Sequence, residues 1–125
     1  MKLRTAHNSL RLRINQLELE TLRQAKKLFD YVQFTEHEND RIEYEIRSSL
    51  IPEILVQFAK NRITVEIPEF LFNQWTETDL VGIDHTIVLT DGLRLFVLIE
   101  KDFKCLTPRM NEDEALNFEN PLSEC

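Results

Sequence analysis

Short turn sequences recur between runs in which apolar and polar residues alternate, and this pattern constrains the fold more than any other feature of the chain. Asp91-Gly92 separates "TIVLT" from "LRLFVLIE" and predicts a type I′ turn, which needs a positive φ at both central residues. Further two-residue turns are predicted at Lys60-Asn61, Asn39-Asp40 and His7-Asn8. The chain is therefore expected to fold as a series of β-hairpins.

The alternation inside these runs predicts strands with one wet face. In "RIEYEIR" the apolar residues from Ile42 to Ile46 fall on one face, and Glu43, Glu45 and Arg47 fall on the other. In "SLRLRI" the two arginines, Arg11 and Arg13, oppose the apolar residues in the same way. Strands with one solvated face are typical of antiparallel sheets.

Two helices are expected to interrupt the hairpins. Asn15 and Glu18 have the spacing of a helix N-cap and its reciprocal partner. Leucines at helical spacing follow, and the segment "LELETLRQAKKLF" predicts a helix that continues to Phe29. Pro68 suits the first position of a second, short helix, "PEFLFNQW", which places Trp75 on the same face as a leucine four residues earlier.

These elements predict an α+β fold with a mostly antiparallel sheet of six to eight strands, able to curl into a partial barrel, and two helices. A chain of 125 residues with 42% hydrophobic residues is expected to form a single domain, residues 1–125, that unfolds in one cooperative transition. Residues 102–125 are predicted to dock on it as an acidic tail, with Phe103 and Phe118 as apolar anchors. No internal repeat is visible.

The distribution of charge limits the classes of partner. The net charge of −7 argues against nucleic acid, although residues 1–27 are basic and residues 110–125 are acidic. The carboxylates of residues 112–114 are expected to reach Arg11, Arg13 or Arg109. No apolar stretch has the roughly 20 residues of a membrane span, and no signal peptide is expected. Two cysteines make no disulfide framework, which favours a cytoplasmic location.

The segment "IEKDFKCLTPRMNEDE" holds a candidate nucleophile, Cys105, near the basic residues Lys101, Lys104 and Arg109, which could lower the pKa of the thiol. A thiol enzyme also needs a base, and no histidine lies nearby in the sequence. A cysteine after a strand is more often a small buried apolar residue. "NEDE" offers carboxylates to a hard cation but lacks the spacing of a calcium loop, so a solvated tail is the preferred interpretation.

The leading interpretation of function is a non-enzymatic binding or interaction module, either for a protein partner or as a homodimer. Phosphate loops, nucleophile elbows, C-x-x-C pairs and zinc helices are all missing from the sequence. On the strand "LRLFVLIE", Phe96 and Leu98 add apolar residues to the face that is otherwise charged. A helix or a partner is expected to cover them. No catalytic residue and no cofactor is predicted under this interpretation.

One motif supports an alternative, a metal-dependent phosphohydrolase. Residues 43–47, "EYEIR", resemble the E-x-E-x-(K/R) signature of the triphosphate tunnel metalloenzymes, the CYTH-like family. The resemblance implies Mg²⁺ or Mn²⁺ held by Glu43 and Glu45, and phosphates held by Arg47, Arg11 and Arg13. Alternating charges on a solvated strand produce the same pattern. The alternative requires all five side chains to point into one concave space.

The chain as a whole resembles a family of small uncharacterised bacterial proteins. The residues that carry the resemblance are "MKLR" and "NSLRLRI" at the start, "NRITVEIP", "WTETDLVGI", and "LIEKDFKCL" with "EDE" and "NFENP" at the end. Glu119 stands where the family pattern has proline. The resemblance implies a compact bacterial protein of the cytoplasm, and it implies no mechanism.

Overall fold

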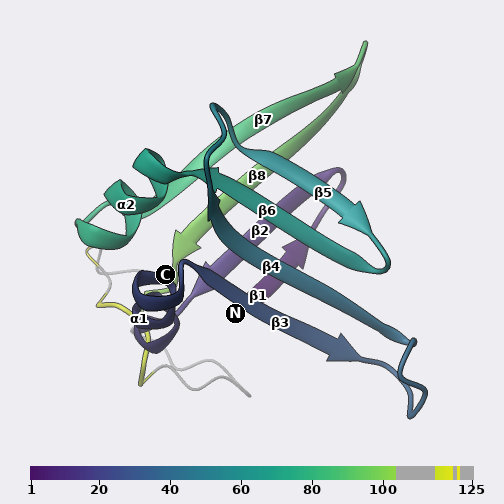
Figure 1. Ribbon diagram of the computed structural model, residues 1–125, viewed down its shortest axis with the longest axis horizontal. Helices are drawn as coiled ribbons and strands as arrows, with labels where there is room; N and C mark the ends of the chain where they lie inside the picture. Colours follow the sequence, from purple (N-terminus) through teal and green to yellow (C-terminus); the bar gives the residue numbers. More distant parts are fainter. Residues whose placement is uncertain (104–114, 120, 122–125) are drawn as a thin grey trace. The chain divides into compact units, whose positions relative to one another are not determined.

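The structure is a computed structural model that describes residues 1–103, 115–119 and 121. Within these residues eight strands and two helices follow one another (Figure 1): β1 (Lys2–Thr5), β2 (Ser9–Ile14), α1 (Gln16–Ala25), β3 (Lys27–Gln33), β4 (Arg41–Ser49), β5 (Leu55–Ala59), β6 (Arg62–Pro68), α2 (Glu69–Glu77), β7 (Gly82–Thr90) and β8 (Leu93–Lys101). Neither helix of the described residues is long and apolar enough to cross a membrane.

The strands form two four-stranded mixed sheets within the described residues, and not one antiparallel sheet that curls toward a barrel. Sheet A has the strand order β1-β2-β8-β7, and sheet B has the order β3-β4-β6-β5. In each sheet two antiparallel hairpins meet through a parallel central pair, which is β2 with β8 in sheet A and β4 with β6 in sheet B. The α+β class, the two helices and a strand number within six to eight are confirmed, and four of the six strand pairs are antiparallel. The correction is that the strands form two mixed sheets and not a single sheet or a partial barrel. The two sheets were not predicted because turn residues determine each hairpin but do not determine which hairpins pair with each other.

Three of the four predicted two-residue turns join paired strands at the predicted residues, His7-Asn8, Lys60-Asn61 and Asp91-Gly92. Both residues of His7-Asn8 and both residues of Lys60-Asn61 have positive φ, as a type I′ turn requires. Gly92 has φ +76, but Asp91 does not have a positive φ, so the type I′ prediction there was wrong, and the strand register shifts between Val88 and Thr90. The Asn39-Asp40 prediction was also wrong, because a loop of residues 34–40 joins β3 to β4.

Helix α1 begins as predicted and ends earlier. The backbone N–H of Asn15 donates to the Glu18 carboxylate at 3.0 Å, and the N–H of Glu18 donates to the Asn15 side-chain oxygen at 2.9 Å, which is a capping box. Lys26 then takes φ +61, a left-handed conformation that ends a helix. Phe29 therefore lies on β3 and not on the helix. Helix α2 starts one residue later than predicted, with Pro68 at its N-cap.

The chain divides into two compact units, residues 1–20 with 81–125 and residues 21–80. The first unit contains sheet A. Its buried apolar residues are Leu19 on α1 and a set on one face of that sheet, which are Leu10, Leu12 and Ile14 on β2, Ile83 on β7, and Val97 and Ile99 on β8. This is the face that the alternation in "SLRLRI" predicted to be apolar.

The second unit contains sheet B and α2, which packs against β4 and β6. Its buried apolar residues are Tyr44, Ile46, Val65 and Ile67 on the sheet, Phe72 and Trp75 on α2, and Leu22 and Ile54. The end of α1 joins this unit, where the Arg23 Nε donates to the carbonyl of Thr76 at 2.8 Å.

The order of elements repeats within the chain. A hairpin, a helix and a second hairpin make up β1 to β4, and the same series makes up β5 to β8. Each half contributes its first hairpin to one sheet and its second hairpin to the other. The sequence showed no repeat, and the structure corrects that conclusion.

The register of the parallel central pairs confirms the equivalence. Ser9 pairs with Phe96 and Arg62 pairs with Glu43, and both 62 − 9 and 96 − 43 equal 53. The two type I′ turns and the fully buried pairs Leu12 and Val65, Ile14 and Ile67, and Leu22 and Trp75 obey the same offset of 53. The two halves share their backbone plan and their buried positions, and few residue identities, which is why the repeat is hard to see in the sequence.

Candidate functional site

Charged and aromatic side chains gather on one face of sheet B, which we call the charged face. It is the face opposite the buried apolar residues of the sheet. By the strand register it carries Lys27, Phe29 and Tyr31 on β3, Arg41, Glu43, Glu45 and Arg47 on β4, and Arg62, Thr64 and Glu66 on β6. The alternation in "RIEYEIR" placed the β4 residues on this face correctly.

Glu43 is held between two arginines on this face. Its carboxylate forms an ion pair with Arg41, and it accepts from the Arg62 Nε at 3.1 Å. The hydrogen bond from Arg41 lowers the pKa of Glu43 below its ordinary value of 4.5; partial burial opposes that change, and Arg62 adds to it. Arg62 also approaches Glu45, at 3.7 Å. Both glutamates of the E-x-E-x-R motif therefore contact the same guanidinium group.

Glu66 is the acceptor of a second cluster on the charged face. Its side chain is buried, and one of its oxygens accepts from Arg47 at 2.9 Å and from the Ser49 hydroxyl at 3.0 Å. The other oxygen accepts from the Gln57 amide at 3.3 Å. A buried carboxylate is stabilised by several donors, so this cluster is a structural element of the sheet.

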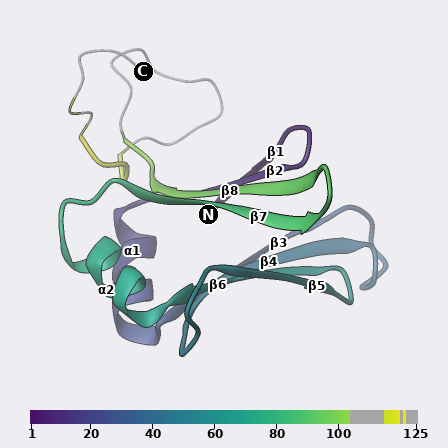
Figure 2. The same ribbon diagram turned by 90° about the horizontal axis from the view of Figure 1, so that it is seen from above.

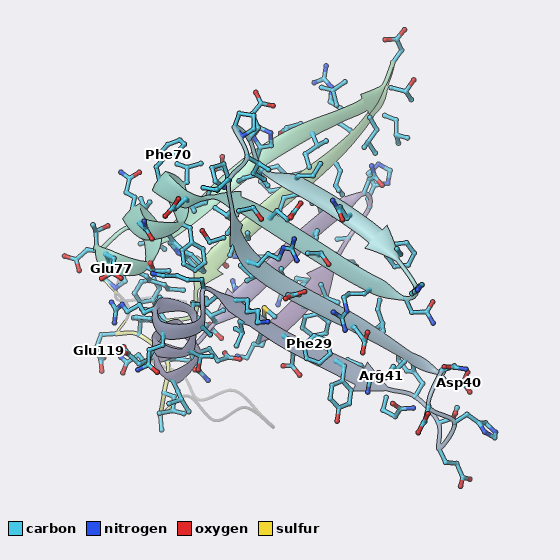
Figure 3. The ribbon with its side chains drawn as sticks, viewed as in Figure 1. Phe29, Asp40, Arg41, Phe70, Glu77 and Glu119 are labelled. Atoms are coloured by element: carbon cyan, nitrogen blue, oxygen red, sulfur yellow. The ribbon has the colours of Figure 1, made fainter. Side chains whose placement is uncertain are left out.

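Two aromatic rings on edge strand β3 remain open to solvent although arginines lie over them. Phe29 is 40% exposed and Tyr31 is 48% exposed. The guanidinium carbon of Arg62 lies 4.8 Å from the centre of the Phe29 ring, and that of Arg41 lies 4.5 Å from the Tyr31 ring. Figure 3 labels Phe29, which lies on β3, and Arg41, which lies on β4. The sequence analysis missed this cluster because it assigned Phe29 to a helix and gave Arg62 no role.

The other half of the chain provides an internal comparison. The equivalent positions in sheet A follow from the shared register: Phe29 corresponds to Asp84, Tyr31 to Thr86, Glu43 to Phe96 and Arg62 to Ser9. The positions of Phe29 and Tyr31 hold no ring, and the position of Arg62 holds no guanidinium group. The backbone plan is the same in both sheets, so the plan does not require the aromatic and arginine cluster.

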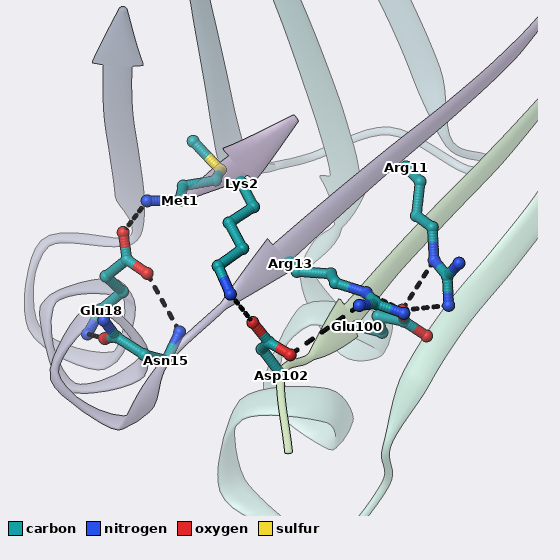
Figure 4. A network of polar contacts seen from close by, with 8 residues as sticks. All are labelled: Met1, Lys2, Arg11, Arg13, Asn15, Glu18, Glu100 and Asp102. Atoms are coloured by element: carbon teal, nitrogen blue, oxygen red, sulfur yellow. Dashed lines mark hydrogen bonds and ion pairs between the residues drawn. The ribbon is translucent and has the colours of Figure 1, made fainter. Parts of the chain in front are cut away.

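Sheet A keeps the ion pair that corresponds to Arg47–Glu66, with the charges exchanged. Arg13 donates to Glu100 at 2.6 Å across the parallel pair, and Arg11 reaches the same oxygen (Figure 4). Asp102, at the end of β8, accepts from Lys2 at 2.6 Å. Figure 4 also shows the amino group of Met1 on Glu18. Arg11 is therefore paired with Glu100, and Arg13 is paired with Glu100 and Asp102. Residues 112–114, which were expected to reach these arginines, lie outside the described residues.

The five residues of the phosphohydrolase alternative belong to two different sheets. Glu43, Glu45 and Arg47 share the charged face of sheet B, and Arg11 and Arg13 lie on sheet A. Among residues 1–103, 115–119 and 121, no group of three or more His, Cys, Asp or Glu side chains is placed to hold a metal ion. The carboxylates of Glu43 and Glu45 each form an ion pair with Arg62.

Most residues of the candidate thiol site lie outside the described residues, namely Cys105, Lys104, Arg109 and the "NEDE" carboxylates. Lys101 is buried, and its ammonium lies 5.7 Å from the centre of the Phe118 ring. Phe118 contacts Phe103 edge to face, with 5.6 Å between the ring centroids, and its N–H donates to the carbonyl of Asp102 at 2.8 Å. Lys101 therefore contacts the C-terminal segment.

The two apolar residues singled out on β8 differ in exposure. Phe96 is 43% exposed, and Leu98 is partly buried. Side chains of the described part of the chain therefore leave much of Phe96 open.

Two hollows lie at the end of sheet B that carries the loop of residues 34–40 and the β5–β6 turn. Figure 2 shows this loop and this turn at the same end of the sheet. The polar hollow, about 480 Å³, includes Glu38, Asn39, Arg41 and Lys60 in its lining. The apolar hollow, about 450 Å³, includes Phe34, Ile42 and Phe58, and by the strand register Ile42 and Phe58 lie on the opposite face of the sheet from Arg41. The sequence analysis missed both hollows because it replaced the loop by a two-residue turn.

A model of a family of unknown function (DUF7009) matches residues 1–122 of the chain. No curated protein and no solved structure matches it. The match confirms the expected membership of a family without an assigned activity. It brings no site residue and no ligand with it.

Proposed function

Since the chain belongs to the DUF7009 family, whose function is not known, we propose from its geometry that it is a non-enzymatic binding module. The charged face of sheet B is its contact surface, and the partner is a protein. A second copy of the chain is one partner of this class.

The observation that carries the proposal is the exposure of Phe29 and Tyr31 beneath arginines. Tyrosine, phenylalanine and arginine are enriched in protein interfaces, where large rigid side chains contribute contact area at a small entropic cost. Arg41 and Arg62 are held in place by Glu43, so their side chains lose little freedom when a partner binds.

The acids on the same face favour a protein over a nucleic acid. Glu43, Glu45 and Glu66 lie among the arginines and oppose the approach of phosphate groups. Alternating charges suit a partner surface that also carries both signs. The net charge of −7 acts in the same direction.

The test compares the double variant Phe29→Ser/Tyr31→Ser with Phe70→Ser. Phe70 is 67% exposed on α2 and is the matched control, because its loss also removes an exposed ring. Light scattering over a concentration series measures self-association, and affinity capture on the immobilised chain measures other partners. The proposal expects a complex that the wild type and the control form and that the double variant loses. A complex that all three proteins form equally, or no complex at all, contradicts it.

The second candidate is the metal-dependent phosphohydrolase, which is favoured only by the shared face of Glu43, Glu45 and Arg47. It predicts hydrolysis of tripolyphosphate in the presence of Mg²⁺ or Mn²⁺. Replacement of Glu43 and Glu45 by glutamine would abolish that hydrolysis, while Phe29→Ser/Tyr31→Ser would leave it unchanged. Absence of metal-dependent phosphate release from the wild type removes this candidate.

A further inference from the structure

Strand β3 is an edge of sheet B, and no described strand pairs with its outer side (Figure 1). The other edge strands of the described residues are less suited to pairing. β1 has four residues, β5 has five, and the register of β7 shifts between Val88 and Thr90. Short edges and bulges discourage pairing with another chain. β3 has seven residues and pairs with β4 without a shift from Lys27 to Gln33, so it is the edge most able to accept another strand.

Two hydrogen bonds at the ends of β3 show which of its backbone groups face outward. The Ser48 N–H donates to the carbonyl of Lys26 at 3.0 Å. At the other end the Phe34 N–H donates to the carbonyl of Asp40 at 2.9 Å. Both pairs extend the register of β3 with β4 by one residue, and bonding alternates along an antiparallel pair, so the even-numbered residues of β3 bond to β4. The backbone groups that face the open edge therefore belong to Lys27, Phe29, Tyr31 and Gln33.

The residues whose backbone groups face outward also carry the exposed rings of the charged face. Phe29 is 40% exposed and Tyr31 is 48% exposed, and both side chains lie on that face. A strand added beside β3 would place its own side chains next to these rings, because residues opposite each other on paired strands are direct neighbours. Strand addition would therefore satisfy the open backbone groups and cover the rings in one contact.

One contact protects this edge within the single chain. The Tyr31 N–H donates to the Asp30 carboxylate at 2.8 Å, so one of the outward donors is already satisfied. By the register, Asp30 lies on the face opposite the charged face. The carboxylate therefore competes with an added strand for this donor but does not touch a partner that docks on the charged face. This difference makes Asp30 a test of strand addition.

The chemistry of β3 fits a second β3. Its sequence, KLFDYVQ, carries one cation and one anion, so two copies bring no net charge together. The edge strand β1 carries Lys2 and Arg4 and would repel its own copy. Each β3 also supplies rings on the charged face and outward backbone groups at the spacing that the other requires. A second copy of the chain is therefore the partner that this edge matches.

We propose that β3 pairs antiparallel with β3 of a second copy, which joins two copies of sheet B into one sheet of eight strands. The inference rests on the proposed function and adds the partner and the mode of contact. A two-fold axis at Phe29 sets the two Phe29 rings side by side, Lys27 against Tyr31, and Leu28 against Asp30. In this register outward backbone groups meet outward backbone groups. An axis at Asp30 is disfavoured, because it places two carboxylates directly opposite each other.

The experiment combines light scattering with amide hydrogen exchange by NMR, on the full chain from micromolar to millimolar concentration. We expect a dimer at the upper end of the series. The amide protons of Lys27, Phe29 and Gln33 should exchange at least about tenfold more slowly in the dimer than in the dilute chain, because they become bonded to the second copy. Those of Leu28 and Val32 face β4 and should be protected at every concentration, so they are the internal control.

A matched pair of variants tests the protecting contact. Asp30→Ala releases the Tyr31 N–H to the second copy and should tighten the dimer by about three- to tenfold. Glu36→Ala removes the same charge from an exposed position in the loop after β3 and should leave the dimer unchanged. Circular dichroism confirms that each variant is folded. If Asp30→Ala does not fold, the exchange measurement on the wild type decides alone.

The outcomes separate this inference from the proposed function. If Phe29→Ser/Tyr31→Ser abolishes a dimer in which the outward amides exchange at the monomer rate, the charged face is an interface and strand addition is wrong. A wild type that stays monomeric throughout the series also overturns strand addition, while affinity capture still tests the charged face for another protein. Strand addition is equally wrong if a folded Asp30→Ala variant forms the dimer no more tightly than Glu36→Ala.

Discussion

Replacing Phe118 by alanine tests what holds the C-terminal segment on the first unit. The ring contacts Phe103 edge to face and lies beneath the ammonium of Lys101, and it is partly buried. A fully buried phenylalanine costs about 3–5 kcal/mol when it is truncated to alanine, and partial burial reduces this to about 2 kcal/mol, including the ring pair. For a chain of this size that corresponds to a fall in melting temperature of about 6–10 °C.

The assay is thermal unfolding followed by circular dichroism, with Phe96→Ala as the control. Phe96 is 43% exposed, so its truncation should lower the melting temperature by much less. Deleting residues 110–125 should cost more than Phe118→Ala, because it also removes the Leu116 carbonyl that accepts the backbone N–H of Gln16 at 2.8 Å. Neutralising Glu112, Asp113 and Glu114 together should cost less, since exposed ion pairs contribute about 0–1 kcal/mol each. If the triple neutralisation is the more damaging change, the reasoning from aromatic packing is refuted.

Four further predictions concern the rest of the chain. Because the pKa of Glu43 is lowered, its ionised carboxylate contributes to stability above pH 4.5, and this contribution is lost as the pH falls through the folded-state pKa. Glu43→Gln should therefore be less stable than the wild type in urea unfolding, and the difference between the two should shrink as the pH is lowered. Glu66→Ala should cost about 2–3 kcal/mol by urea unfolding, because it leaves Arg47 without its buried acceptor. Gly82→Ala should cost about 1–3 kcal/mol in the same assay, because an added Cβ would lie 2.8 Å from the carbonyl oxygen of Ile99. Calorimetry should show one unfolding transition, because helix α1 (Gln16–Ala25) is continuous across the boundary between the two compact units; two resolved transitions would contradict this.

Local features of the fold could be predicted from the sequence, and long-range features could not. The capping box at Asn15, the turn at Lys60-Asn61 and the wet and dry faces of β4 follow from residue types at fixed spacings, because their causes lie within a few residues. The parallel pairing of β2 with β8 depends on residues 87 positions apart, Ser9 and Phe96, and no turn or alternation signals it.

The candidate sites were missed for a related reason. The ring of Phe29 fitted the helical spacing of "LELETLRQAKKLF", and only the left-handed backbone of Lys26 ends the helix before it. The loop of residues 34–40 holds two consecutive turn-forming residues, Asn39 and Asp40, which favoured a tight turn over the longer loop. Lys60 was considered only for its backbone, so its side chain was not assigned to a site.

The exchange of hairpins between the two sheets has a consequence for synthesis on the ribosome. Residues 21–80, which contain all of sheet B, form one continuous stretch, so this sheet can assemble while the chain is still growing. Sheet A must wait, because β2 pairs with β8 and the last residue of β8 is Lys101. During that interval β2 exposes the apolar side chains of Leu10, Leu12 and Ile14 without their final partner strand. A nascent chain stalled before residue 93 should therefore contain a protease-resistant central unit preceded by an N-terminal hairpin that remains open to a chaperone.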